Sequence, residues 1–160
     1  MYKIVVALSL LAGPALATGL EIEIAGEANG TVKIDLYEDI APGHVEQITA
    51  LASEGAYDGV VFHRVIDGFM AQTGDVQFGK LEGGDMGRAG MGGSERPDLN
   101  SGNSQFFIMF DAGEFLNGQY TVVGQVTEGL EIVDAIKRGT GPNGAVVGQP
   151  DVMTRVTVTD

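Results

Sequence analysis

Two stretches of this chain carry the side chains best suited to bind and act on a ligand. They are residues 62–75, FHRVIDGFMAQTGD, and residues 104–108, SQFFI. Each mixes β-forming apolar residues with polar ones, which is typical of a strand at the edge of a binding surface. Arg64 can donate several hydrogen bonds, and three apolar side chains accompany it: Phe69, Met70 and Phe107. These features predict a site for an apolar ligand that carries a peptide carbonyl, and such a site needs no nucleophile.

The remaining pattern predicts the elements that position these side chains. Apolar and polar residues alternate over residues 20–25 and 31–36, on either side of an Asn29-Gly30 turn signal. Pro42 can begin a helix that Gly55 ends, and a second helix is expected over residues 130–137. Alternation returns over residues 152–159. Many β-rich segments with only two helices predict a mainly β protein, a closed antiparallel barrel capped by the helices, because closure removes exposed sheet edges.

The first 17 residues have the pattern of a secretory signal peptide. Lys3 precedes an apolar run over residues 4–12, and Ala15-Leu16-Ala17 forms a cleavage site with small residues. The run is too short to cross a bilayer as a helix of about 20 residues, although an uncleaved membrane anchor is the alternative. We therefore expect residues 1–17 to be removed and residues 18–160 to fold as one exported domain.

Charge and cysteine content exclude several kinds of site. The chain has no cysteine and a formal charge of −13. Loss of Lys3 with the signal leaves 8 basic and 22 acidic residues (9 − 1 = 8), a charge of −14. This balance disfavours nucleic acids and anionic membranes as partners, because both are bound through basic patches. Solubility is the simpler explanation of the acidity.

Taken together, the motifs resemble those of the cyclophilins, a family of peptidyl-prolyl cis-trans isomerases. The resemblance covers about residues 20–160 and rests on residues 62–75, on NSQFFI at 103–108 and on FLNGQYTVVG at 115–124. Three separate motifs in the family's order are far more specific than a single motif.

The resemblance implies a role for each matching residue. Arg64 matches the catalytic arginine, while Gln72 and Gln105 match the amides that hold the substrate backbone. The walls of the proline pocket are implied to be Phe69, Met70, Phe107 and Leu116, and Phe115 and Tyr120 are implied to contact the substrate as well. Tyr120 stands where many members have His, and we expect this exchange of polar aromatic rings to be tolerated. Phe115 stands where some members have Trp, so tight binding of the family's cyclic-peptide inhibitor is not implied. His63 also matches, and we expect it to support the structure.

The chemistry of the residues agrees with this assignment. An X-Pro amide isomerises slowly because its C–N bond has partial double-bond character, with a barrier of about 18–20 kcal/mol. Twisting makes the nitrogen pyramidal, so that it can accept a hydrogen bond from Arg64 in the transition state only. No metal and no cofactor is expected. Without the surrounding motif, a surface ion pair would be the simpler role for Arg64.

One departure from the family lies between Asp75 and Ser104. A cyclophilin normally has a strand with a Met-Ala pair here, and none is found in this sequence. We therefore expect a barrel with one strand fewer, an altered subsite beyond the proline and a lowered activity.

These observations predict a periplasmic, monomeric prolyl isomerase that assists the folding of exported proteins by binding their proline-containing segments. The alternative from another class is a binding module that holds such segments but turns them over poorly, because its groove is incomplete. A third reading, a structural β-barrel, would make Arg64, Gln72 and Gln105 incidental.

Overall fold

The computed structural model describes residues 17–93 and 104–160. Its strands are β1 (Gly19–Ala25), β2 (Gly30–Leu36), β3 (Val60–Val61), β4 (Arg64–Ile66), β5 (Met70–Thr73), β6 (Phe106–Met109), β7 (Gly124–Glu128) and β8 (Val152–Thr159). Its α-helices are α1 (Pro42–Ser53) and α2 (Leu130–Asp134), and two short 3₁₀ turns are η1 (Glu114–Leu116) and η2 (Pro142–Gly144). The predicted signal peptide, apart from its last residue, and residues 94–103 lie outside the described residues.

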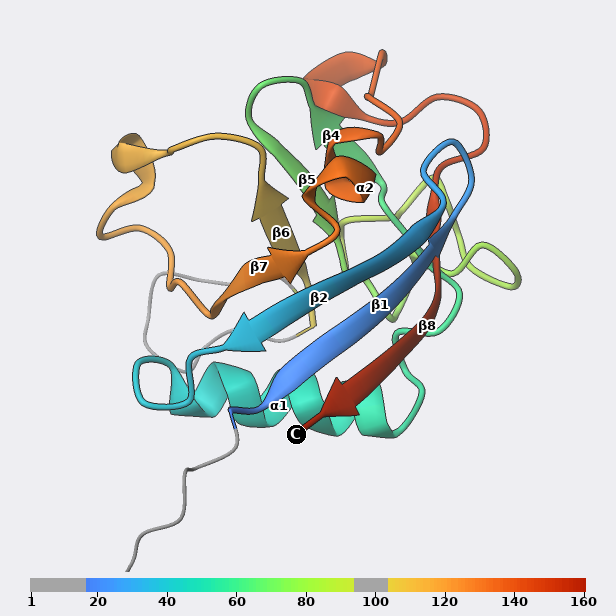
Figure 1. Cartoon of the computed structure of the whole chain (residues 1–160). Helices are drawn as coiled ribbons and strands as arrows, with labels where there is room; N and C mark the ends of the chain where they lie inside the picture. Colours follow the sequence, from blue (N-terminus) through green and yellow to red (C-terminus); the bar gives the residue numbers. More distant parts are fainter. Residues whose placement is uncertain (1–16, 94–103) are drawn as a thin grey trace, which may run out of the picture.

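The strands form two hydrogen-bonded sheets (Figure 1). One has the order β3-β8-β1-β2-β7 and the other the order β4-β5-β6, with antiparallel pairing throughout. The prediction of a mainly β fold with two helices is confirmed. The predicted closed barrel is not, because no ladder among the described strands joins β6 to β7.

The β1–β2 hairpin follows the predicted alternation. Leu20, Ile22 and Ile24 are buried, and Glu23 between them is exposed. β1 pairs with β2 on one side and with β8 on the other, so its apolar face lies at the centre of the larger sheet. A shift of one residue would turn this face to solvent, which is why the alternation fixes the register.

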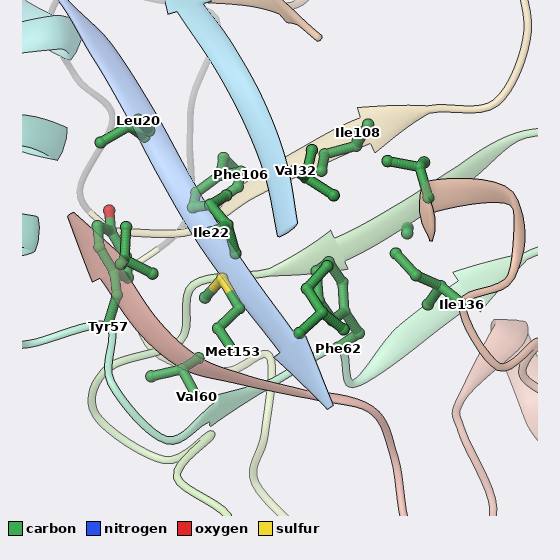
Figure 2. Close-up of a cluster of buried hydrophobic side chains, with 14 of the residues drawn as sticks. Leu20, Ile22, Val32, Tyr57, Val60, Phe62, Phe106, Ile108, Ile136 and Met153 are labelled. Carbon is green, nitrogen blue, oxygen red and sulfur yellow. The ribbon is translucent and has the colours of Figure 1, made fainter. Parts of the chain in front are cut away.

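The hydrophobic core lies between the two sheets (Figure 2). It includes Ile22 of β1, Met153 of β8, Phe106 of β6, and Phe62. Tyr57 packs its ring against Phe106 edge-on, at 5.7 Å between ring centroids, and its hydroxyl donates to the carbonyl of Ser104 at 2.8 Å. The core therefore fixes the inner face of β6 and leaves its outer face for the site.

The two helices lie at opposite ends of the β structure (Figure 1). α1 begins at Pro42 and is followed by Gly55 at φ +73°, as predicted. α2 ends at Asp134, so the prediction of a helix to residue 137 is wrong at its end. The main-chain N–H of Lys137 donates instead to the distant carboxylate of Asp151 at 2.7 Å. Neither helix, nor any other in the described part of the chain, is long and apolar enough to cross a membrane.

The central segment after β5 contains no strand as far as residue 93. Residues 76–93 form turns and one isolated bridge between Val60 and Lys80. Together with the missing ladder between β6 and β7, this is what the sequence predicted for the described part of the segment.

Candidate active site

The smaller sheet brings the predicted polar side chains onto one surface. Arg64 of β4 lies opposite Gln72 of β5, and Gln72 lies opposite Phe107 of β6. Directly paired residues of antiparallel strands project from the same face of a sheet. Strand pairing alone therefore places the cation, an amide and an aromatic ring side by side.

A pocket of about 320 Å³ lies on this surface. Eight predicted residues line it: Arg64, Phe69, Met70, Gln72, Gln105, Phe107, Leu116 and Tyr120. Phe107 and Tyr120 meet edge-on, with ring centroids 5.2 Å apart. The ninth predicted residue, Phe115, is not in the lining and is 65% exposed, but its ring lies 5.4 Å from that of Phe69. The structure thus brings eight predicted residues together and leaves Phe115 at the outside.

The Arg64 guanidinium is held by two elements. Its Nε donates to the main-chain carbonyl of Asn143 at 2.8 Å, and one terminal nitrogen donates to Asn143 Oδ1 at 3.1 Å. The other terminal nitrogen donates to Gln72 Oε1 at 3.2 Å. Of its five N–H groups, these bonds to described residues use three, which leaves two for a ligand. The cation is therefore fixed in orientation and still able to donate.

Gln72 is oriented in turn by Gln105. Gln72 Nε2 donates to Gln105 Oε1 at 3.0 Å, while Gln105 Nε2 donates to the carbonyls of Gly92 at 2.8 Å and of Gly90 at 3.2 Å. Gln105 is buried. Its amide thus contacts protein groups at both ends, and the structure shows it positioning Gln72.

The glycine loop that receives Gln105 is held by a buried carboxylate. Asp75 Oδ2 accepts from the N–H of Gly90 at 2.7 Å and of Gly92 at 3.1 Å, and its Oδ1 accepts from Gln77 and Phe78. Burial by itself would raise the pKa of the Asp75 carboxyl, but the main-chain donors outweigh it and keep the pKa below its ordinary value. Asp75 is therefore ionised at neutral pH and anchors the loop.

His63 lies next to the site, in a cavity lined also by Arg64, Gln72 and Gly90. A side chain at Gly90 would meet its Nε2 at 2.9 Å, and its buried Nδ1 has no hydrogen-bond partner among the described residues. Burial lowers the pKa of His63; nearby Asp75 raises it, and Arg64 adds to the lowering. The imidazole is therefore neutral at pH 7. Because His63 lines this neighbouring cavity together with Arg64 and Gln72, its supporting role stays a prediction.

Sequence reasoning missed several residues that shape the site. Asn143 holds Arg64, Gly90 and Phe106 line the pocket, and Asp75 received no role although it ends the first motif. The turn sequence Pro142-Asn143-Gly144 was the available signal. Asn143 adopts φ +55°, a left-handed conformation that Asn tolerates better than most residues.

Comparison with known proteins places the chain in one family. The family described as "Cyclophilin type peptidyl-prolyl cis-trans isomerase/CLD" matches residues 20–158. The chain is 50% identical over 153 aligned residues to a probable peptidyl-prolyl cis-trans isomerase of Brucella suis, covering 81% of this chain and 78% of that protein. It is 36% identical over 126 residues to peptidyl-prolyl cis-trans isomerase B of Bacillus subtilis, covering 71% and 87%.

Solved structures agree at the level of the fold. A crystal structure of a cyclophilin type peptidyl-prolyl cis-trans isomerase from Cryptosporidium parvum superposes with a TM-score of 0.70 at 20% identity, covering 91% of this chain and 99% of that chain. The cyclophilin AquaCyp293 of Hirschia baltica gives a TM-score of 0.66 at 24% identity, over 87% and 73%. From the site geometry, the matched residues and these relatives, we conclude that the chain belongs to the cyclophilin-type peptidyl-prolyl cis-trans isomerases.

Proposed function

We propose that this prolyl isomerase lowers the rotational barrier of an X-Pro amide through hydrogen bonding from Arg64. The observation that carries the proposal is the position of Arg64, fixed by Asn143 and Gln72 at the edge of an apolar pocket with two N–H groups left over. A planar amide nitrogen accepts no hydrogen bond, because its lone pair is delocalised. The twisted amide can accept one, so the interaction favours the transition state over the ground state.

The pocket supplies the second part of the mechanism. Phe69, Met70, Phe107 and Leu116 can enclose a proline ring. Burying an apolar ring contributes roughly 25 cal/mol per Å² of area removed from water. The ring is then held still while the flanking carbonyl rotates, and Gln72 is available to bind the substrate main chain. No step in this mechanism moves a proton or uses a metal or a cofactor.

Kinetics with a short X-Pro peptide test the role of Arg64. We expect Arg64→Ala to lower kcat/KM by about 100-fold, or about 2.7 kcal/mol, with an unchanged circular dichroism spectrum. Arg64→Lys should recover little, because an ammonium lacks the planar fork that Asn143 and Gln72 hold. A folded Arg64→Ala protein with the original rate would overturn the proposal.

A second candidate is a module that binds proline segments with little turnover. The observation favouring it is that, among the described strands, no ladder joins β6 to β7. Peptide affinity measured beside the isomerisation rate separates the two candidates. Tight binding by a chain that gives no rate above the uncatalysed reaction would favour the module.

We also propose a cellular compartment for this activity. Residues 1–17 have the features of a cleaved export signal, so we place the mature chain in the periplasm as a monomer that assists the folding of exported proteins. The mature N-terminus should be Thr18, as read by mass spectrometry of the soluble exported fraction. An intact Met1 in a membrane pellet would indicate an anchor instead.

We also propose that the two sheets are the two halves of a closed barrel. β3 and β4 follow each other along residues 60–66 and join the two sheets on one side. On the other side, where no ladder joins β6 to β7 among the described strands, a further strand would close the barrel.

A further inference from the structure

Two strand edges border one apolar groove. β6 pairs only with β5, and β7 pairs only with β2, among the strands that the structure describes. A cavity of about 520 Å³ lies between the unpaired edges of these two strands. Its apolar walls include Ile34, Ile108, Met109, Val122, Val126 and Leu130. We call this cavity the seam groove.

The backbone of β6 presents hydrogen-bonding groups to the seam groove. The N–H of Phe110 donates to the carbonyl of Phe69 at 2.9 Å, in continuation of the β5–β6 ladder. Successive main-chain groups of a strand point to alternate edges, so Phe106, Ile108 and Phe110 face β5. Phe107 and Met109 then direct their N–H and C=O groups to the opposite edge. Within residues 17–93 and 104–160, neither residue has a recorded main-chain partner on that side.

The seam groove is next to the proline pocket. Phe106, Phe107, Leu116 and Tyr120 line both cavities. A peptide whose proline occupies the pocket therefore has neighbouring residues within reach of the β6 edge. An extended segment gains most in such a place, because it can satisfy strand-edge groups and fill an apolar channel at once.

We propose that the seam groove binds an extended apolar stretch of the substrate chain beside its proline, which adds a strand to β6. The inference rests on the proposed isomerase function, and it names the substrate class: proline segments adjoining about five or six residues of β-forming sequence. The added strand would lie between β6 and β7 and complete the barrel. Unfolded chains have such stretches exposed, whereas folded proteins bury them.

Charge favours a substrate chain over a second copy of this protein. Among the described residues that line the groove, Glu114 is the one charged side chain, and the whole chain carries −13. Two copies meeting at this groove would bring like charges together. A basic residue in the bound stretch would face Glu114 favourably, so we expect neutral or basic stretches to bind better than acidic ones.

Matched peptides test the proposal. One is a four-residue X-Pro peptide, and two others carry the same core with six alternating Val and Lys residues attached before or after it. We expect one of the longer peptides to show a KM roughly tenfold lower, since several cross-strand contacts contribute a few tenths of a kcal/mol each. On binding, hydrogen exchange at the amides of Phe107 and Met109 should slow, which contact through side chains alone would not cause.

The chain offers a matched pair of variants. Val122 lines the seam groove but not the proline pocket and is 64% exposed, whereas Val147 is 58% exposed and lines neither cavity. Val122→Asp should bring the ratio of long-peptide to short-peptide kcat/KM close to one. Val147→Asp should leave that ratio at its original value. Comparing ratios removes any general effect of the added charge on the protein.

Each outcome decides the proposal. Equal KM values for the short and long peptides, or the same ratio in both variants, would overturn it. Dimers in sedimentation that Val122→Asp dissociates and Val147→Asp does not would assign the groove to self-association and also overturn it. Loss of the isomerase function can be told apart, because a long peptide with Ala in place of Pro still reports groove binding by fluorescence anisotropy. Binding of that peptide by a chain without turnover would sustain the groove and reject the proposed function.

Discussion

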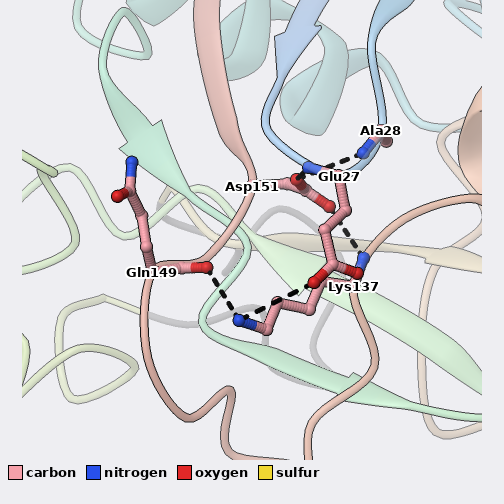
Figure 3. A network of polar contacts seen from close by, with 5 residues as sticks. All are labelled: Glu27, Ala28, Lys137, Gln149 and Asp151. Carbon is pink, nitrogen blue, oxygen red and sulfur yellow. Dashed lines mark hydrogen bonds and ion pairs between the residues drawn. The ribbon is translucent and has the colours of Figure 1, made fainter.

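Two buried aspartates, Asp75 and Asp151, use the same chemistry in different regions of the molecule. Each carboxylate accepts several main-chain N–H groups, and neither has a recorded ion pair with a described cation. Asp75 binds the glycine loop that leads through Gln105 to the active site. Asp151 accepts from Glu27 and Ala28 in the β1–β2 turn and from Lys137 after α2 (Figure 3).

The two aspartates differ in the part of the fold to which their bound segments belong. The segments held by Asp151 join β1, β2 and the end of α2, which are parts of the core, and Lys137 adds a bond to the Gln149 carbonyl and an ion pair with Glu27 (Figure 3). The loop held by Asp75 leads to Gln105 and Gln72, whose side chains line the pocket. A carboxylate that caps main-chain donors can therefore serve stability in one place and catalytic geometry in another.

Substitution of Asp151 should give the largest effect, and the effect should be on stability. Asp151→Ala leaves three main-chain donors without an acceptor: the N–H of Ala28, which is buried, and those of Glu27 and Lys137, which are partly buried. A fully buried unpaired donor costs roughly 1–3 kcal/mol, so we expect a loss of about 3 kcal/mol in the free energy of unfolding. The folded fraction should keep its kcat/KM. Urea unfolding gives the first quantity and a peptide assay at low temperature the second. Since Asp151→Ala can fail to fold, Asp151→Asn, which keeps one acceptor, provides a milder version with the same expected direction.

Substitution of Asp75 should act mainly on catalysis. Asp75→Asn replaces an acceptor by a donor beside the N–H groups of Gly90 and Gly92, so the loop that holds Gln105 should shift. We expect kcat/KM to fall about tenfold, equivalent to about 1.4 kcal/mol, with a smaller loss of stability than in Asp151→Asn. Should Asp75→Asn unfold more easily but keep the full rate when folded, the coupling through Gln105 and Gln72 would be refuted.

The contrast also explains what the sequence could predict. Alternation set the β1–β2 hairpin correctly because the two strands are adjacent in sequence and bury one face each. The end of α2 was mispredicted because Asp151, 14 residues away, captures the N–H of Lys137. In the site, strand motifs located Arg64 and Gln72, which pair within one hairpin. Asn143, 79 residues from Arg64, could be identified only once the fold had brought the two together.

Asn143 gives a smaller effect on the same site. Asn143→Gly keeps the left-handed backbone conformation and the main-chain carbonyl, but it removes the Oδ1 that accepts from Arg64. We expect kcat/KM to fall about threefold to tenfold, since one hydrogen bond to a charged group is lost and another remains. Asn143→Asp retains an acceptor and should retain most of the rate. A rate unchanged in Asn143→Gly would show that Gln72 alone orients the guanidinium.

The smallest expected effect is on the pKa of His63, and it distinguishes the role of Asp75 from that of Asp151. Burial lowers the folded-state pKa of His63 below the ordinary value of about 6.5, so between these two pKa values the unfolded chain binds more protons than the folded one. Stability should therefore decrease as the pH falls through about 6.5, and the decrease should stop below the folded-state pKa. The charged groups that act on His63 are Asp75, which raises its pKa, and Arg64, which lowers it.

It follows that Asp75→Asn should lower the pKa of His63 further, because the attraction that favours the imidazolium is removed, whereas Asp151→Asn should leave it unchanged. NMR titration measures this directly, since the chain has two histidines whose signals can be assigned separately. An equal shift in both variants would mean that His63 responds to general loosening of the fold. A shift of the His63 pKa in Asp75→Asn alone would show that the charge of Asp75 acts on the site. The charge of Asp151 would then not act on it, which is the difference that the geometry predicts.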